Sequence, residues 1–395
     1  MSISDSSADT AVASPAFPET AGNSPIRIVS VGDIMIGTDY PENHLPDDDG
    51  VGFLSAVTPW LRDADITIGN LEGVLIDAGE PRKQCQVAQA CFLFRSPARY
   101  AKYFAAAGFD VMNLANNHAR DFGEDGRSKS MENLESVGIK HTGRKGDFAL
   151  TRIRGLDLAV LGFAVTRNSN LLLDYEVAAR TVSRFASGND IVIVTFHAGA
   201  EGRNVTRLPF AEEYYYGEMR GDVVKFARLM VDSGADLVVG HGPHVVRGME
   251  VYRDRLIAYS LGNFATYYGI SVEGIKGIAP ILLTTLDDRG RFLEGQIYST
   301  IQIRPRGPVP DPQHRALKLL RRLSLQDFAH PGIHFLDDGR MLKVPRTTDQ
   351  PADHLPVFRP TSWLTSIRAV RPSRYSSPTA TALKSTPRLL NLRYK

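Results

Sequence analysis

Apolar runs rich in β-branched residues recur along the chain from Ile26 onward, and such runs are typical of buried β-strands. They cover residues 26–31, 66–68, 111–114, 158–163, 191–196, 237–239 and 256–260. Between them, apolar residues at helical spacing predict amphipathic helices at residues 97–107, 127–137 and 221–233. Strand and helix alternate, which predicts an α/β domain.

The pattern changes after residue 278, where two apolar runs follow each other without a helix between them. Residues 279–286 and 292–303 flank the turn sequence Asp-Asp-Arg-Gly-Arg, which predicts an antiparallel hairpin. A short basic helix at 315–323 and a second turn at 337–340 follow. The number of strands predicts two mixed β-sheets that pack face to face and are flanked by helices. The expected fold class is therefore α/β.

Composition divides the chain into three parts. Residues 1–25 are mainly Ser, Ala, Thr, Pro and Asp, which bury too little apolar surface to offset the entropy of folding, so we expect a disordered segment. Residues 26–345 carry all the predicted elements and are expected to form one domain. Residues 346–395 are rich in Pro, Ser and Arg and are expected to form a basic tail.

The overall composition, 43% hydrophobic and 23% charged, excludes a fully disordered chain and a fibrous repeat. The chain has 46 Lys and Arg against 44 Asp and Glu, yet residues 361–395 hold seven of the basic residues and none of the acidic ones. A basic tail attracts nucleic acid or anionic lipid through its charge, but this one lacks amphipathic periodicity. A disordered extension is the better interpretation, and no specific nucleic-acid partner is expected.

No run approaches the roughly 18 apolar residues of a transmembrane helix, and the first 25 residues lack the features of a secretory signal. As written, the sequence predicts a cytoplasmic protein, with cell-envelope association if the true start lies upstream. Its two cysteines, Cys85 and Cys91, are too few for a tetra-thiolate zinc site. They would close a small hairpin in an oxidising compartment and stay as thiols in a reducing one, and both alternatives remain open.

Polar residues follow the predicted strands where each strand ends. Ligands of open α/β sheets gather at the carboxyl ends of strands, because the connections leave a crevice there. Six segments contribute such residues: Asp33, Asn70, Glu72, Asn116, Asn117, His118, His197, Glu201, His241, His244 and Asn263. Carboxylate, amide and imidazole groups together suit manganese, iron or zinc, whereas magnesium and calcium prefer oxygen ligands alone. These ligands exceed one coordination set, which predicts two divalent metal ions.

Each of these residues has an ordinary structural explanation when taken alone. Asp33 fits a helix N-cap, Asn116 and Asn263 fit turns, and His197 fits a hydrogen-bonded core histidine. The coincidence across six segments, rather than any one position, favours the metal site. The sequence has no phosphate-binding loop motif and no nucleophile elbow, so those two classes of enzyme are not indicated.

Six motifs carry a resemblance to a known family. They are Val31-Gly-Asp-Ile-Met-Ile-Gly37, Gly69-Asn-Leu-Glu-Gly73, Asn113-Leu-Ala-Asn-Asn-His-Ala119 with Asp121-Phe-Gly, Phe196-His-Ala-Gly-Ala-Glu201, Gly240-His-Gly-Pro-His-Val-Val246 and Tyr259-Ser-Leu-Gly-Asn-Phe264. Their order and spacing resemble the CapA family of poly-gamma-glutamate capsule synthesis proteins, within the calcineurin-like metallophosphoesterase superfamily. The resemblance covers about residues 26–300. It implies a metallophosphatase-like fold, an α+β-type four-layer sandwich in which two mixed β-sheets are flanked by helices.

The resemblance also implies a role for each residue. Asp33 and His244 would hold one metal, Glu72 would bridge, and the second metal would be held by Asn116, His197 and His241. His118 resembles the histidine that protonates the leaving group, and Asn117 and Asp121 accompany it in the catalytic motif. Substrate binding is expected from Asn70, Glu201 and Asn263.

Two positions depart from the superfamily's usual pattern. Met35 stands where a histidine ligand of the first metal is usual, and the bridging Asp is replaced by the longer Glu72. The first metal therefore has one ligand fewer, unless an oxygen from elsewhere, such as Glu201, takes the place. Both departures resemble CapA itself.

Two functions are consistent with this pattern. The first is a metal-dependent hydrolase linked to capsule or poly-gamma-glutamate biosynthesis, in which metal-activated water attacks a phosphate ester or a peptide-like amide. The second is a non-catalytic accessory protein that handles a polyanionic polymer in a capsule synthesis complex. Either function predicts a polyanionic or phosphate-bearing substrate.

Overall fold

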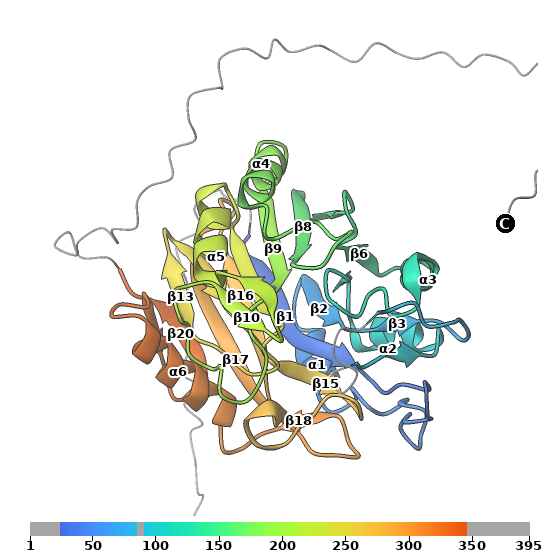
Figure 1. Cartoon of the computed structure of the whole chain (residues 1–395). Helices are drawn as coiled ribbons and strands as arrows, with labels where there is room; N and C mark the ends of the chain where they lie inside the picture. Colours follow the sequence, from blue (N-terminus) through green and yellow to red (C-terminus); the bar gives the residue numbers. More distant parts are fainter. Residues whose placement is uncertain (1–23, 85–90, 346–395) are drawn as a thin grey trace, which may run out of the picture. The chain divides into compact units, whose positions relative to one another are not determined.

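Two β-sheets pack face to face in the computed structural model, which describes residues 24–84 and 91–345 (Figure 1). Helices cover the outer face of each sheet, so the layers run helix, sheet, sheet, helix. This is the predicted four-layer α/β sandwich. The predicted boundaries at residues 25 and 346 stay predictions, because residues 1–23 and 346–395 lie outside the described part. Cys85 also lies outside it, so the two alternatives for Cys85 and Cys91 are both kept.

The first sheet has the strand order β19-β20-β17-β16-β1-β2-β5-β6, with β15 beside β1 and β18 beside β17. Strands β1, β2, β5 and β6 are parallel, and β16 and β17 form the predicted antiparallel hairpin. The strands are β1 (Ile26–Met35), β2 (Ile66–Leu71), β5 (Val111–Asn113), β6 (Lys140–Thr142), β15 (Asn263–Thr266), β16 (Ile278–Leu286), β17 (Phe292–Gln302), β18 (Pro308–Pro310), β19 (Ile333–Phe335) and β20 (Arg340–Lys343).

The second sheet has the order β13-β14-β12-β9-β8-β7, and its central strands β14, β12, β9 and β8 are parallel. Its strands are β7 (Ala149–Ile153), β8 (Leu156–Ala164), β9 (Ile191–His197), β12 (Leu237–His241), β13 (Met249–Tyr252) and β14 (Arg255–Ala258). Two small ladders stand apart, β3 (Val74–Leu75) with β4 (Arg95–Ser96) and β10 (Glu213–Tyr215) with β11 (Glu218–Gly221).

Alternation of side chains along β1 explains how one strand serves two layers. Ile26 and Ile28 point into the core between the sheets, while Val29 and Val31 point into the core under the first helical layer. Strand neighbours face opposite sides of a sheet, so a strand buried on both sides is apolar throughout. Burying each such side chain contributes about 1.5–3 kcal/mol to the stability of the fold.

Helices α1 (Thr58–Leu61), α2 (Tyr100–Ala107) and α3 (Gly123–Glu135) contribute to the core on the first sheet, and α4 (Tyr175–Ala186) and α5 (Val223–Asp232) to the core on the second. Helix α6 (Arg315–Asp327) packs on β16 and β17, and a 3-10 turn, η2 (Gly274–Gly277), precedes β16. The carboxylates of Asp174 and Asp222 accept hydrogen bonds from backbone N–H groups in the first turns of α4 and α5. Such N-caps fix where each helix begins.

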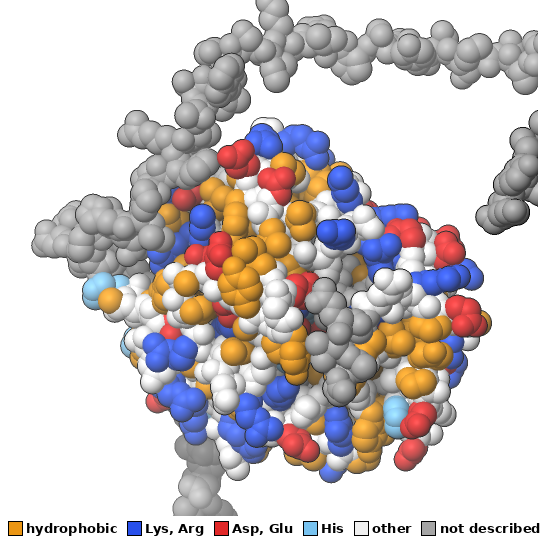
Figure 2. Space-filling view, viewed as in Figure 1, with side chains coloured by type: hydrophobic (Ala, Val, Ile, Leu, Met, Phe, Trp, Pro, Cys, Tyr) orange, Lys and Arg blue, Asp and Glu red, His pale blue; other side chains and the backbone are white. Residues whose placement is uncertain are grey.

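The predicted strands and helices are all present, with differences at their ends. Strand β1 continues to Met35 rather than ending before Asp33, and α3 begins at Gly123, four residues earlier than expected. The sequence did not predict helices α1 and α4, or the strands β3, β4, β6, β7, β10, β11, β13, β15, β18, β19 and β20. Among the described residues, no helix is long and apolar enough to cross a membrane. Basic and acidic side chains are interspersed on the face shown in Figure 2, in keeping with their near-equal numbers.

Candidate metal centre

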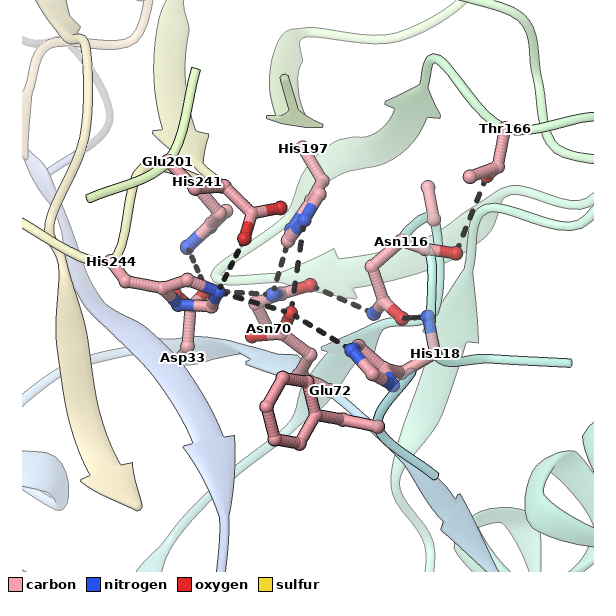
Figure 3. Close-up of polar contacts among 12 residues, drawn as sticks. Asp33, Asn70, Glu72, Asn116, His118, Thr166, His197, Glu201, His241 and His244 are labelled. Carbon is pink, nitrogen blue, oxygen red and sulfur yellow. Dashed lines mark hydrogen bonds and ion pairs between the residues drawn. The ribbon is translucent and has the colours of Figure 1, made fainter. Parts of the chain in front are cut away.

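The carboxyl ends of strands from both sheets meet at one place (Figure 3). From the first sheet, Asp33 lies in β1 and Glu72 follows β2. From the second sheet, His197 ends β9 and His241 ends β12, and these two residues are paired in the parallel ladder. The sandwich therefore brings together residues that are far apart in the sequence.

A bulge in β1 places Asp33 within the strand, where the sequence predicted it just beyond. The register shifts on both sides of it, between Ser30 and Asp33 against β2 and between Asp33 and Ile34 against β15. A β-carbon on Gly32 would lie 1.9 Å from the carbonyl oxygen of Gly262, so only glycine allows this approach. The backbone N–H of Asp33 donates to that same oxygen at 2.8 Å.

The Asp33 carboxylate is fully buried and is held from two sides. Asn70 donates from Nδ2 to Oδ1 at 2.8 Å, and Nδ1 of His244 lies 3.0 Å from Oδ2. Nδ1 of His241 lies 3.6 Å from Oδ1. Two imidazoles thus surround one carboxylate, which is an arrangement suited to a divalent cation.

Glu72 is fully buried and neither carboxylate oxygen has a hydrogen-bond partner. Its Oε1 lies 3.8 Å from Nε2 of His197, 3.7 Å from Nε2 of His244 and 4.0 Å from Nε2 of His118. Burial raises the pKa of Glu72 to about 8, although the charge of His244 opposes the shift. The carboxylate therefore occupies the centre of a ring of imidazoles.

His244 stands in the left-handed region of backbone space, with φ of 58°, which turns its ring back toward the strands. Burial lowers the pKa of this imidazole, but the carboxylates of Glu72 and Asp33 outweigh burial and raise it to about 10. Without a cation, the proton on His244 is the positive charge closest to the carboxyl groups of Asp33 and Glu72. A metal ion would take over that role and release the proton.

The pKa values of His197 and His241 shift in the opposite direction from that of His244. Burial lowers the pKa of His197 well below its ordinary value, and it lowers the pKa of His241 to about 4. Both rings are therefore neutral near pH 7, and neutral imidazole is the form that binds metals. Nε2 of His197 and Nδ1 of His241 are buried without a hydrogen-bond partner.

These orphaned atoms test whether the residues fit a metal. Buried polar atoms are nearly always hydrogen-bonded, so unpaired oxygens and nitrogens gathered at one point indicate a missing partner. Ligand atoms of Asp33, Glu72 and His197 lie within 4.8 Å of one another. The mixture of carboxylate and imidazole fits a divalent ion of the manganese, iron or zinc type.

His118 and Asp121 form a buried pair at the edge of this cluster. Nδ1 of His118 lies 2.7 Å from Oδ2 of Asp121, and the ring stacks on Phe94 at a centroid distance of 4.2 Å. Asp121 also accepts a hydrogen bond from the backbone N–H of Phe94 at 2.8 Å. Burial lowers the pKa of His118, and Asp121 opposes the shift. The pair fixes the ring so that Nε2 points toward Glu72.

Three asparagines connect the ligands to the strands. Asn116 donates from Nδ2 to the Leu71 carbonyl at 2.8 Å, and its Oδ1 accepts the backbone N–H of His118 at 3.0 Å. Asn70 accepts from Asn116 at 3.2 Å while donating to Asp33. Oδ1 of Asn263 lies 3.0 Å from Nδ1 of His244. The amides of Asn70 and Asn263 are thus engaged with predicted ligands, whereas Oδ1 of Asn117 is buried without a partner.

Glu201 reaches the cluster from the loop after β9. Its Oε2 lies 3.7 Å from Nε2 of His244, and Arg220 holds Oε1 at 3.1 Å. Met35 does not take part, because its side chain packs with Phe94 and Ile270. Glu201 thus has a carboxylate oxygen beside His244, whereas the side chain of Met35 lies in apolar surroundings.

Sequence reasoning did not single out Arg220 and Lys83. Arg220 is 1% exposed and belongs to the β10–β11 ladder, and Nζ of Lys83 lies 3.1 Å from Oδ1 of Asp121. Neither residue follows an apolar strand, so the strand-end pattern carried no signal for them.

Comparison with known proteins places the chain in a family. A family model described as "Bacterial capsule synthesis protein PGA_cap" matches residues 27–268, which is more than half of the chain. This protein belongs to the PGA_cap family. The match includes the motifs from Gly32 to Phe264 that surround the candidate centre, and it confirms the resemblance drawn from them.

Relatives within the PGA_cap group are moderately similar. "Capsule biosynthesis protein CapA" of Bacillus anthracis is 30% identical over 273 residues, covering 61% of this chain and 60% of that protein. "PGA biosynthesis protein CapA" of Bacillus subtilis is 30% identical over 251 residues, covering 59% and 61%. A Mycobacterium tuberculosis relative, "Probable polyglutamine synthesis accessory protein", is 26% identical over 247 residues, covering 54% of this chain and 57% of that protein. The chain spans about three fifths of the length of these curated relatives.

Solved structures give a weaker likeness for this PGA_cap protein. A 5'-nucleotidase precursor of Thermus thermophilus has a TM-score of 0.39 at 15% identity, covering 76% of this chain and 59% of that one. A purple acid phosphatase from yellow lupin has a TM-score of 0.35 at 10% identity, covering 75% and 56%. Scores this low carry no argument about function, which is therefore argued from the centre itself.

Proposed function

We propose that this PGA_cap protein is a metal-dependent hydrolase of capsule or poly-gamma-glutamate metabolism. It would use water activated by divalent metal to cleave a phosphate ester or a peptide-like amide. The observation that carries the proposal is the unpaired, fully buried Glu72 carboxylate beside the unpaired ring nitrogens of His197 and His241. A buried anion with no donor is costly unless a cation compensates it.

The ligands divide into two sets around Glu72, which is the bridging residue of the proposal. Asp33 and His244 form one set, and Glu201 lies close enough to complete it. The other set would be Asn116 and His197 together with His241, whose Nδ1 lies 3.6 Å from Oδ1 of Asp33. Two ions of the manganese, iron or zinc type would lower the pKa of a bound water and offset negative charge on the substrate.

The protein's own groups would do the remaining work. His118 would pass a proton to the leaving group from Nε2, and Asp121 would hold the ring through Nδ1. Asn117 is the neighbour of His118 in the chain, and its amide oxygen, which has no hydrogen-bond partner, can accept a hydrogen bond from the substrate. Asn70 and Asn263, predicted as substrate-binding residues, bond Asp33 and His244, so their contacts favour a positioning role.

Hydrolysis assays with matched variants test this proposal. Turnover of an aryl phosphodiester, an aryl phosphomonoester and a gamma-glutamyl amide would be measured with added manganese. His118→Ala and His241→Ala should each lower the activity, while His334→Ala, an exposed histidine on β19, should leave it unchanged. Wild-type protein that turns over none of the three substrates would contradict the hydrolase proposal.

A non-catalytic accessory role is the second candidate. It is favoured by the Mycobacterium tuberculosis relative, which is named a probable accessory protein of polyglutamine synthesis. In that case the protein would use the same centre to hold a polyanionic polymer within a capsule synthesis complex. The same assays separate the two candidates. Metal that is bound without turnover, together with polymer binding that is lost in His241→Ala, would support the accessory role.

A further inference from the structure

A cavity of about 280 Å³ opens beside the candidate metal centre, and Asn116 belongs to both. Asn117, Thr166 and Ser169 supply neutral polar groups to its wall. No acidic side chain lines the cavity, whereas five basic ones do: Arg82, Lys83, Arg120, Arg127 and Arg167. This charge distinguishes the cavity from the surface in Figure 2, where the two signs are interspersed.

Some of these charges are already paired and some are not. Arg127 is buried and is held by Glu124 at 2.6 Å and by the Asn168 carbonyl at 3.0 Å. Arg120 lies 3.2 Å from the same Glu124. Within the described part of the chain, Arg82 and Arg167 are exposed and have no acidic partner. Two guanidinium groups are therefore available to a ligand.

Lys83 connects the cavity to the chemistry. Its Nζ lies 3.1 Å from Oδ1 of Asp121 and 3.3 Å from Nδ1 of His118. Asn117 lies on the same wall, and an asparagine amide can donate to an oxyanion through its NH2 group. A ligand group in the cavity would thus lie next to the His118–Asp121 pair, because Lys83 contacts both residues and lines the cavity.

We propose that this cavity binds an oxyanion of the substrate, a carboxylate or a phosphate, that neighbours the bond at the metal centre. The inference rests on the proposed function and deepens it, because it defines the substrate as a chain with repeated negative charges. Arginine suits this task, since its planar fork donates two parallel hydrogen bonds to a carboxylate or a phosphate. A substrate with one isolated charge would leave the cavity unused.

Binding measurements on the full chain with its bound metal test the inference. The probes are a short oligo-γ-glutamate, which offers carboxylates, and tripolyphosphate, which offers phosphates. The variant Arg82→Ala/Arg167→Ala removes the two unpaired charges from exposed positions, so the fold should be kept. The control Arg306→Ala/Arg322→Ala removes the same charge from exposed positions that do not line the cavity.

The cavity variant should raise the dissociation constant of at least one probe, measured by calorimetry, by roughly tenfold or more, because two charge-assisted hydrogen bonds are lost. The control should change it by less than about twofold, as expected of distant screened charges. The probe that binds more tightly to wild type identifies carboxylate or phosphate as the natural group. Equal weakening in both variants, or no binding of either probe to wild type, would overturn the inference.

This result is separable from the hydrolase proposal. Small aryl phosphates carry no second anion, so their turnover reports on the metal centre alone. If the protein hydrolyses these substrates but oligomer binding is unchanged when Arg82 and Arg167 are replaced, only the inference about the cavity is overturned. Arginine-dependent oligomer binding without any turnover would support the cavity and count against hydrolysis.

Discussion

Glu72 is the side chain whose state depends most on a bound cation. It is fully buried among imidazoles, without a hydrogen bond, and burial raises its pKa to about 8. A carboxyl with a higher pKa in the folded than in the unfolded state binds more protons when folded. In metal-free protein, the stability that Glu72 contributes is therefore present below its ordinary pKa of 4.5 and is lost as the pH rises toward about 8.

Glu72→Gln keeps the shape of this residue and removes its charge. In metal-free protein at pH 8, the variant should be more stable than wild type by about 1–3 kcal/mol, because an unpaired buried charge costs more than an unpaired neutral amide. The difference should shrink as the pH falls to 5. Denaturant unfolding at several pH values measures it, and a wild-type protein more stable than the variant at pH 8 would contradict the assignment.

His118 and Asp121 act as one unit in the proposal. His118→Ala should lower the turnover of an aryl phosphodiester by about 10²–10⁴-fold, the usual contribution of a positioned acid. Asp121→Asn should lower it too, because the amide no longer anchors the protonated ring. Metal content should be unchanged in both. A large loss of metal in either variant would mean that the pair supports the ligands instead.

Strand β1 is the element on which the site depends most. Its bulge sets Asp33 between β2 and β15, and the contact of Gly32 with the Gly262 carbonyl holds the bulge in place. Strand β15 in turn supplies Asn263, which bonds His244. One irregularity in a central strand thus orients ligands from several segments.

Gly32→Ala should destabilise the fold by about 1–3 kcal/mol or more, since its methyl group would overlap a backbone oxygen that cannot move away. It should also weaken metal binding by displacing Asp33. Thermal unfolding measures the first effect and metal titration the second. Gly188→Ala is the control, because a β-carbon there meets only open space. Equal melting temperatures for the two variants would refute the role of the bulge.

The sequence predicts the central strands of both sheets and most of the described helices, but not the short strands or the irregularities. Apolar runs identify strands buried on both faces, and the β16–β17 hairpin follows from its turn residues. The bulge at Asp33 escapes prediction because a polar residue inside a strand looks like the strand's end. Helix α4 does carry an apolar stripe, and three of the stripe's six residues are alanines, which make it less conspicuous in the sequence: Tyr175, Ala178, Ala179, Val182, Phe185 and Ala186.

At the scale of the whole molecule, the centre depends on the packing of two sheets. Asp33 and Glu72 come from the first sheet, and His197 and His241 come from the second. The core between the sheets, which includes Ile28 and Ile193, fixes their separation. The sequence predicted that strand ends would meet, but the strand order and the contacts of Arg220 and Lys83 depend on tertiary packing that no local pattern encodes.

A metal that takes ligands from both sheets should stabilise the folded chain. Binding at about 100 times the dissociation constant adds about 2.7 kcal/mol to the free energy of unfolding. Manganese should therefore raise the melting temperature of wild type and have little effect on His241→Ala. A rise of equal size in both proteins would indicate that manganese binds elsewhere.

Metal content is the most direct test of the central claim that this fold holds a dinuclear centre. Elemental analysis of the purified chain, incubated with manganese, iron or zinc and then freed of excess ion, gives the number of ions per chain. We predict about two for wild type and fewer for Glu72→Gln, because the bridging carboxylate is lost. No bound divalent metal in wild type after these incubations would contradict the account.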